Sequence, residues 1–140
     1  MDSQIIIEII NQDYQRITER IEKFLHEQIN RSKTKGLIFG QSGGIDSAVL
    51  AYICQRVLKK NSLALIMPDT KVSPKSETED ALLMIDKIGL EYKLIDIAPI
   101  VNEYSKYLEP NDFAFGNLRA RIRMNLLYYY ANSKNYLVLG

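Results

Sequence analysis

Short apolar runs alternate along this chain with longer stretches in which apolar residues recur every three or four positions. The run at 37–39 lies between two glycines and is too short for a helix, so we interpret it as a buried strand. Further strands are predicted at 62–67, which Pro68 ends, at 92–97 and at 136–140. Strands that alternate with helices at this spacing form right-handed βαβ crossovers. The sequence therefore predicts an α/β fold with a mostly parallel sheet covered on both faces.

Helical periods fill the segments between the predicted strands. The helix that follows residues 40–47 is expected to use Ile45, Val49, Tyr52 and Ile53 as its apolar positions. The next helix is predicted to begin at SETE (76–79), which has the form of a capping box, and to end at Gly89. The predicted arrangement is one domain over 1–140, with an N-terminal helix at 3–31 that becomes amphipathic from Tyr14, an α/β part at 36–140, and later helices at 99–107 and 118–131.

Composition limits the class of protein. A chain of 140 residues with 46% hydrophobic and 25% charged residues is typical of one globular domain. Lys and Arg number 18 against 17 for Asp and Glu, so the net charge of +1 predicts no nucleic-acid or membrane partner. The single cysteine, Cys54, excludes an internal disulfide. The apolar run at 5–10 is interrupted by Glu8 and is far shorter than the about 20 residues that span a bilayer, so we expect a cytoplasmic protein.

The loop GQSGGIDS (40–47) joins the first predicted strand to a helix start. It lies at the carboxyl edge of the sheet, where ligands bind in such folds. Unpaired backbone N–H groups and the positive end of a helix dipole attract phosphate there. The three glycines remove Cβ atoms and permit positive φ angles, and the two serines add hydroxyl donors. Asp46 would repel phosphates unless a divalent cation lay between them, which favours a Mg²⁺ nucleotide.

The familiar phosphate-binding motifs do not match this loop. A Walker loop needs a lysine, and none lies between Gly36 and Arg56, while the G-x-G-x-x-G fingerprint is also absent. From spacing alone, a glycine turn with an Asp N-cap stays open as an alternative.

The sequence SGGIDS (42–47) resembles the pyrophosphate loop, S-G-G-x-D-S, of the ATP pyrophosphatase superfamily, whose members adenylate a substrate oxygen and release pyrophosphate. Within that superfamily, MP (67–68), DALLMIDKIGL (80–90) and GNLRARIRM (116–124), followed by YLVLG at the end of the chain, resemble the NAD synthetase family. The similarity runs from about Gly36 to Gly140. It implies a three-layer αβα fold of the adenine nucleotide α-hydrolase type, which is Rossmann-like.

The resemblance also implies a reaction and a set of site residues. The family amidates deamido-NAD to NAD with ammonia, through an adenylated intermediate, and releases AMP and pyrophosphate. Its members are homodimers. By position, Asp46 would bind Mg²⁺, Asp46 and Ser42 would act in catalysis, and Arg121 would contact deamido-NAD. The implied ATP-binding residues are Gly40, Gln41, Ser42, Gly43, Gly44, Ile45, Asp46 and Ser47.

The residues alone do not single out Arg121. Arg119 and Arg123 share a helix face while Arg121 points elsewhere, and three arginines on a helix often form only a solvated face. His26 is interpreted as a surface residue and Cys54 as core packing rather than as a general base and a nucleophile. The three tyrosines at 128–130 cannot all be core, and one or two could pack across a dimer interface.

The resemblance also shows one departure and leaves rivals open. The family continues beyond the position of Gly140 with a T-G-N loop and a glutamate that also binds Mg²⁺, so we expect a fragment with little activity alone. One rival is a tRNA-thiolating or GMP-forming ATP pyrophosphatase, although the chain has neither paired cysteines nor a basic surface composition. The other is a non-catalytic nucleotide-binding or dimerisation module.

Overall fold

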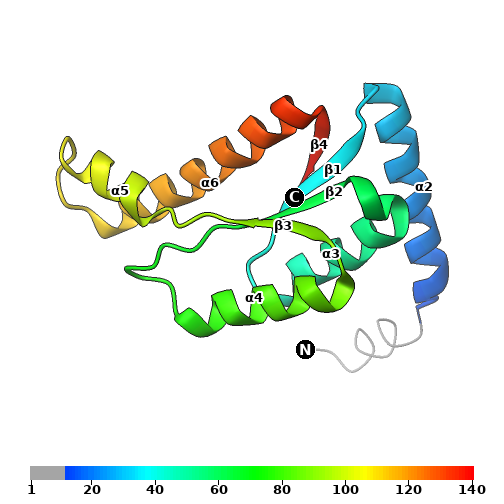
Figure 1. Cartoon of the computed structure of the whole chain (residues 1–140), viewed down its shortest axis with the longest axis horizontal. Helices are drawn as coiled ribbons and strands as arrows, with labels where there is room; N and C mark the ends of the chain where they lie inside the picture. The colour runs from blue at the N-terminus through cyan, green and yellow to red at the C-terminus, as the bar shows by residue number, and fades with distance from the viewer. Residues whose placement is uncertain (1–11) are drawn as a thin grey trace.

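A computed structural model describes residues 12–140, whose four strands form one parallel sheet (Figure 1). The spatial order is β3-β2-β1-β4, so the chain builds outward from β1 to one edge and then crosses to the other. The predicted parallel α/β sheet is confirmed. The strands are β1 (Gly36–Gly40), β2 (Ser62–Ile66), β3 (Glu91–Leu94) and β4 (Tyr136–Leu139), with Ile38 opposite both Leu63 and Val138.

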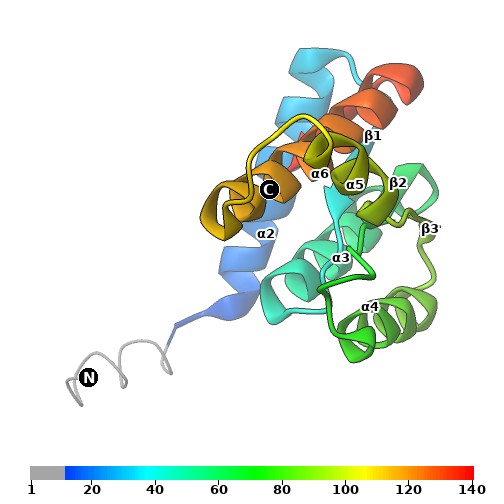
Figure 2. The ribbon, with the colours of Figure 1, turned by 90° about the vertical axis from the view of Figure 1, so that its left-hand side faces the viewer.

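Helices cover both faces of this sheet, which gives three layers (Figure 2). The helices α2, α3 and α4 pack on one face, and α5 and α6 pack on the other. Their bounds are α2 (Tyr14–Ser32), α3 (Ile45–Leu58), α4 (Lys75–Ile88), α5 (Ala98–Ser105) and α6 (Asp112–Lys134), with a 3₁₀ turn η1 (Lys59–Asn61) before β2.

The central strand β1 supplies both cores. Leu37 and Phe39 face the cluster under α2, α3 and α4, whereas Ile38 faces the cluster under α5 and α6. All three are fully buried, because successive side chains of a strand point to opposite faces and both faces are covered. This double burial explains why the strand is a continuous apolar run in the sequence.

The buried face of α3 differs from the prediction. Ile45, Val49 and Tyr52 are 78%, 50% and 46% exposed, and of the four predicted positions only Ile53 is buried. The face toward the sheet instead carries smaller side chains. Apolar residues occur all around α3, so their period alone does not tell which face is buried. The residues that face the protein interior are Ser47, Ala48, Ala51, Ile53, Cys54 and Val57.

Two helix starts also differ from the prediction. The capping box at 76–79 is wrong: α4 begins at Lys75 after Pro74, and no side chain caps it. Proline suits this place because its fixed φ and missing N–H cost nothing at a helix start. The helix α6 begins six residues before the predicted 118, because the side chain of Asn111 accepts a hydrogen bond from the N–H of Ala114 at 2.9 Å.

Other local predictions are confirmed or fall outside the described residues. Gly89 ends α4 in the left-handed conformation (φ 75°), and α2 is helical from Tyr14, while residues 3–11 of the predicted N-terminal helix lie outside the described part. His26 is exposed and Cys54 is buried, as expected, and burial raises the pKa of the Cys54 thiol to about 12. Within residues 12–140, no helix is long and apolar enough to span a bilayer.

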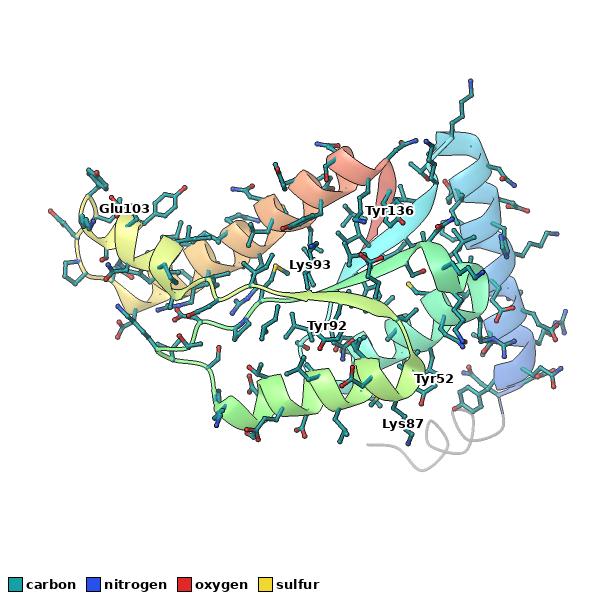
Figure 3. All side chains as sticks on the ribbon, in the orientation of Figure 1. Tyr52, Lys87, Tyr92, Lys93, Glu103 and Tyr136 are labelled. Atoms are coloured by element: carbon teal, nitrogen blue, oxygen red, sulfur yellow. The ribbon has the colours of Figure 1, made fainter. Side chains whose placement is uncertain are left out.

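The tyrosines at the end of α6 divide as the helix geometry requires. Tyr128 and Tyr129 are 52% and 66% exposed, whereas Tyr130 packs against the core under α6 and meets Tyr129 edge to face. Lys93 on β3 is labelled in Figure 3, and its ammonium lies 5.6 Å from the centre of the Tyr130 ring. The exposed pair is available for contacts with another molecule, so the dimer interface stays a prediction.

Candidate functional site

The loop at 40–47 leaves the carboxyl end of β1 and enters α3. Gly44 is the N-cap of α3 in extended conformation, and no side chain caps the helix start. The first N–H groups of α3 therefore keep their capacity to donate to a ligand. Asp46 lies inside the first turn of α3, so the alternative of an aspartate N-cap is wrong.

Among the three loop glycines, only Gly43 is demanded by the local geometry. Its φ is +88°, and a Cβ built on it would lie 2.6 Å from the carbonyl oxygen of Glu77 in α4. Gly40 and Gly44 have no positive φ, and their nearest neighbours to a built Cβ are 3.7 Å and 3.4 Å away. The expectation that all three serve positive φ angles is therefore wrong. Gly43 lets the loop pass directly over the first turns of α4.

The two serines of the loop hydrogen-bond within the loop. The Ser47 hydroxyl donates to the Gly44 carbonyl at 2.9 Å and accepts from the Ser42 N–H at 3.2 Å. Because the Ser47 proton is already used, the contact of 3.2 Å between the two hydroxyls has Ser42 as donor. The Ser42 oxygen also accepts from the Gly44 N–H at 3.3 Å. These bonds hold the turn in shape, and Ser42 remains exposed at its surface.

Asp46 offers one exposed carboxylate in the first turn of α3. A carboxylate is favoured there by the helix dipole. Within the described part of the chain, no group of three or more His, Cys, Asp or Glu side chains could hold a metal ion. A single exposed carboxylate at this place could serve Mg²⁺ only as one ligand among phosphate oxygens and water, an arrangement common for this ion.

A cavity of about 390 Å³ opens beside the loop at the carboxyl edge of the sheet. This volume falls in the range of small-molecule sites, roughly 300–1,000 Å³. Of the predicted ATP-binding residues, Gly40, Gln41 and Ser42 line it, whereas Ile45, Asp46 and Ser47 continue into α3 and do not. The remaining walls come from the end of β2 and from α4 and α6: Leu65, Ile66, Met67, Pro68, Ser73, Glu77, Thr78, Ala81, Arg123 and Leu127.

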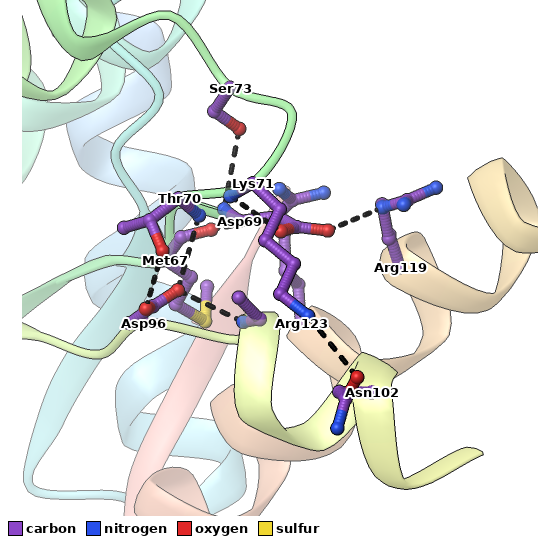
Figure 4. Close-up of polar contacts among 10 residues, drawn as sticks. Met67, Asp69, Thr70, Lys71, Ser73, Asp96, Asn102, Arg119 and Arg123 are labelled. Carbon is purple, nitrogen blue, oxygen red and sulfur yellow. Dashed lines mark hydrogen bonds and ion pairs between the residues drawn. The ribbon is translucent and has the colours of Figure 1, made fainter. Parts of the chain in front are cut away.

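Two arginines of α6 hold the segment that follows β2 (Figure 4). The Arg119 Nε donates to Asp69 Oδ2 at 2.6 Å, and the Arg123 Nε donates to the Met67 carbonyl at 2.9 Å. Asp69 is 1% exposed. Burial lowers the pKa of the Arg123 guanidinium from its usual range, and the charge of Arg119 adds to this, while Asp69 opposes it. The predicted shared face of Arg119 and Arg123 is confirmed, and it is a packed face rather than a solvated one.

Arg121 points away from this contact and is exposed on α6. The helix period separates it from Arg119 and Arg123, as the sequence predicts. Its proposed contact with deamido-NAD stays a prediction.

The segment 67–73 is tied to its surroundings by further polar contacts, shown in Figure 4. Asp96 accepts from the Thr70 N–H and hydroxyl at 3.2 Å and 2.7 Å and from the Ala98 N–H at 2.9 Å. Burial alone would raise the pKa of Asp96, but these hydrogen bonds outweigh it and lower the pKa from its ordinary value. The Lys71 ammonium donates to Asn102 Oδ1 at 3.1 Å. The strand β3 ends at Leu94, earlier than the predicted 97.

Sequence reasoning missed Arg123 as part of the cavity wall, and it missed the ion pair of Asp69 with Arg119. The available signals were an aspartate directly after the strand-ending Pro68 and two arginines one helical turn apart. Neither signal identifies its partner, because Asp69 and Arg119 are 50 residues apart in the sequence.

The sequence is similar to known proteins of one family. Residues 17–140 match the NAD synthase family. A relative from Campylobacter jejuni, named NH(3)-dependent NAD(+) synthetase, is 46% identical over 129 residues, covering 91% of this chain and 52% of the relative. The chain thus spans about half the length of the curated relatives that it matches.

Solved structures give the same family. The NH3-dependent NAD synthetase of Campylobacter jejuni superposes with a TM-score of 0.87 at 44% identity, covering 92% of this chain and 56% of that one. An NMN synthetase from Francisella tularensis gives 0.86 at 29% identity, covering 93% and 55%. With a matching fold and this similarity over most of its residues, the chain belongs to the NAD synthase family.

Proposed function

We propose that this chain takes part in the ATP-dependent amidation of deamido-NAD to NAD with ammonia, as an ammonia-dependent ligase. The observation that carries the proposal is the loop at 40–47, which leads from a cavity of about 390 Å³ to the uncapped start of α3. Its relatives at 46% identity are named for this reaction. Ammonia, ATP and deamido-NAD are the proposed substrates, and the cytoplasm is the proposed location.

The loop is suited to hold the phosphates of ATP. The free N–H groups at the start of α3 and the helix dipole attract anions, and the turn at Gly43 brings backbone rather than side chains to the ligand. Asp46 would hold Mg²⁺ together with phosphate oxygens, and a bound Mg²⁺ would offset negative charge on the leaving pyrophosphate. With the phosphates on the loop, the ribose and base lie in the adjoining cavity, whose walls include Leu65, Met67 and Leu127.

The proposed reaction has two steps. The nicotinate carboxylate attacks the α-phosphorus of ATP, and the bond to the leaving pyrophosphate breaks. Ammonia then attacks the carbon of the mixed anhydride, AMP leaves with the bonding electron pair, and loss of a proton from nitrogen gives the amide. The residues of this chain position the reactants and stabilise charge, with the exposed Ser42 hydroxyl beside the phosphates. Cys54 is no candidate nucleophile, because it is buried with a pKa of about 12.

Two further parts of the proposal concern α6. Arg121 is exposed, and its planar guanidinium suits the carboxylate or pyrophosphate of deamido-NAD through paired hydrogen bonds. Exposed Tyr128 and Tyr129 would pack in the two-fold contact of a homodimer, where tyrosine is enriched. Light scattering at micromolar concentration tests the dimer.

Calorimetric titration with ATP in the presence and absence of Mg²⁺ tests the proposed function, followed by an assay of AMP and NAD from deamido-NAD and ammonium. We expect saturable Mg²⁺-dependent binding and slow turnover in which AMP and NAD form in equal amounts. Binding without AMP would favour the non-catalytic module, and no binding would overturn the proposal. Nicotinate mononucleotide serves as a second acceptor, because the Francisella neighbour at 29% identity is named an NMN synthetase; faster amidation of the mononucleotide would assign that substrate instead.

A further inference from the structure

Gln41 carries a side-chain amide that has no hydrogen-bond partner. The residue is 3% exposed, and both Nε2 and Oε1 are covered by other atoms. Across residues 12–140, these are the only buried side-chain nitrogen or oxygen atoms without a partner. An unpartnered buried amide costs folding free energy that an apolar side chain of similar size would not. A residue that serves only to fill this position would therefore be apolar.

The position of Gln41 ties this amide to the cavity. Its backbone N–H donates to the Leu65 carbonyl at 2.9 Å, which fixes the residue at the junction of β1 and the loop. Gln41 lines the cavity, between Gly40 and Ser42. Most of the neighbouring wall is apolar, formed by Leu65, Ile66 and other side chains of β2, α4 and α6. Such a wall suits the faces of a flat base, and recognition of its polar edge needs one of the polar lining residues, among which Gln41 carries an amide donor and acceptor side by side.

We propose that the Gln41 amide recognises the base edge of adenine, an inference that rests on the proposed binding of ATP. A carboxamide presents one donor and one acceptor side by side. Adenine offers the complementary pair, its exocyclic amino group as donor and an adjacent ring nitrogen as acceptor, whereas guanine presents two acceptors at the equivalent edge. This recognition requires the Gln41 side chain to rotate out of its covered position, after which both amide atoms would gain partners.

The test compares three nucleotides in calorimetric titrations with Mg²⁺: ATP, GTP and purine riboside triphosphate, which lacks the exocyclic amino group. We expect the wild-type chain to bind ATP about tenfold or more tightly than either of the others, since a bidentate amide contact contributes discrimination of this size. Gln41→Leu should bind all three with dissociation constants within about threefold of one another. Gln41→Met, whose side chain is closer to glutamine in length, should give the same result. It replaces Gln41→Leu in the test if the leucine variant does not fold.

A matched control and a second measurement separate recognition from packing. Gln55→Leu makes the same chemical change on α3, outside the cavity, and should keep the wild-type preference for ATP. Without nucleotide, Gln41→Leu should unfold at a higher temperature than wild type, because it removes the unpartnered amide.

The outcomes distinguish this inference from the proposed function. If the wild-type chain binds no nucleotide, the proposed function itself fails. In another outcome, wild type binds ATP while Gln41→Leu and Gln41→Met keep the wild-type ratio of ATP affinity to purine riboside triphosphate affinity. That result would overturn the role of Gln41 and leave ATP binding standing.

Discussion

Arg119 in α6 and Asp69 after β2 form an ion pair with an Nε to Oδ2 distance of 2.6 Å, and Asp69 is 1% exposed. The two residues are 50 positions apart in the chain, and both line a second cavity. Removing one partner of such a pair leaves a buried charge without compensation, which costs more than the intact pair contributes.

We expect Arg119→Met to lower the free energy of unfolding by about 2–4 kcal/mol, below the cost for a fully buried pair because Arg119 keeps some contact with water. Urea denaturation measures the change. The double variant with Asp69→Asn should lose less than the sum of the two single variants, since neither charge then remains unpaired. Strict additivity would show that the pair does not couple these elements.

Gly43→Ala should destabilise the loop and weaken the binding of its ligand. The substitution forces a side chain into a φ of +88° and places a Cβ 2.6 Å from the Glu77 carbonyl oxygen. We expect a loss of about 1–3 kcal/mol in unfolding free energy and at least a roughly tenfold loss of Mg-ATP affinity. Gly40→Ala is the control for stability, because its added Cβ meets only ordinary contacts at 3.7 Å and 3.9 Å. Equal losses in both variants would contradict the assignment of strain to Gly43.

Asp46→Asn should weaken binding of ATP in the presence of Mg²⁺ by about tenfold and leave binding of ATP without Mg²⁺ nearly unchanged or stronger, since a repulsive charge is removed. Circular dichroism should show an intact fold, because Asp46 is exposed in the first turn of α3. The same change at exposed Asp86 on α4 controls for net charge. An unchanged Mg²⁺ dependence of ATP affinity would remove the metal role from Asp46.

Arg121→Ala should weaken binding of deamido-NAD about tenfold or more while leaving Mg-ATP binding within about threefold of wild type. The reason is the proposed paired contact of its guanidinium with an anionic group of the dinucleotide. Competition titrations with each ligand measure both constants. Arg31→Ala, an exposed arginine in the last turn of α2, is the control. Equal effects on both ligands, or none, would reassign the contact to another residue.

Asp96 should make the free energy of unfolding depend on pH in the acidic range. Its folded-state pKa is lowered, so its carboxylate stabilises the fold above the unfolded pKa of about 3.9, and this contribution is lost as pH falls through the folded value. In Asp96→Asn, the urea midpoint should therefore change less between pH 6 and pH 3 than in wild type. Asp86→Asn should retain the wild-type dependence. A wild-type pH profile in Asp96→Asn would show that other carboxylates carry the acid sensitivity.

The sequence predicts the sheet and the loop well because both are local signals. The run at 37–39 is apolar at every position since both faces of β1 are covered, and the glycines at 43–44 mark a turn before a helix. The pairing of Asp69 with Arg119 is different, because it depends on how α6 crosses the sheet, and no local period encodes that crossing. The buried face of α3 was mispredicted for a related reason, since burial follows what packs against the helix rather than which residues are apolar.

The length of α6 has a mechanical consequence. Its 23 residues form one continuous helix, about 35 Å long, in which Arg119 and Arg123 hold Asp69 and the Met67 carbonyl, and whose C-cap residue, Asn135, donates its amide to the Lys33 carbonyl. One rigid element therefore connects the cavity wall at Met67 with the end of α2 at Lys33.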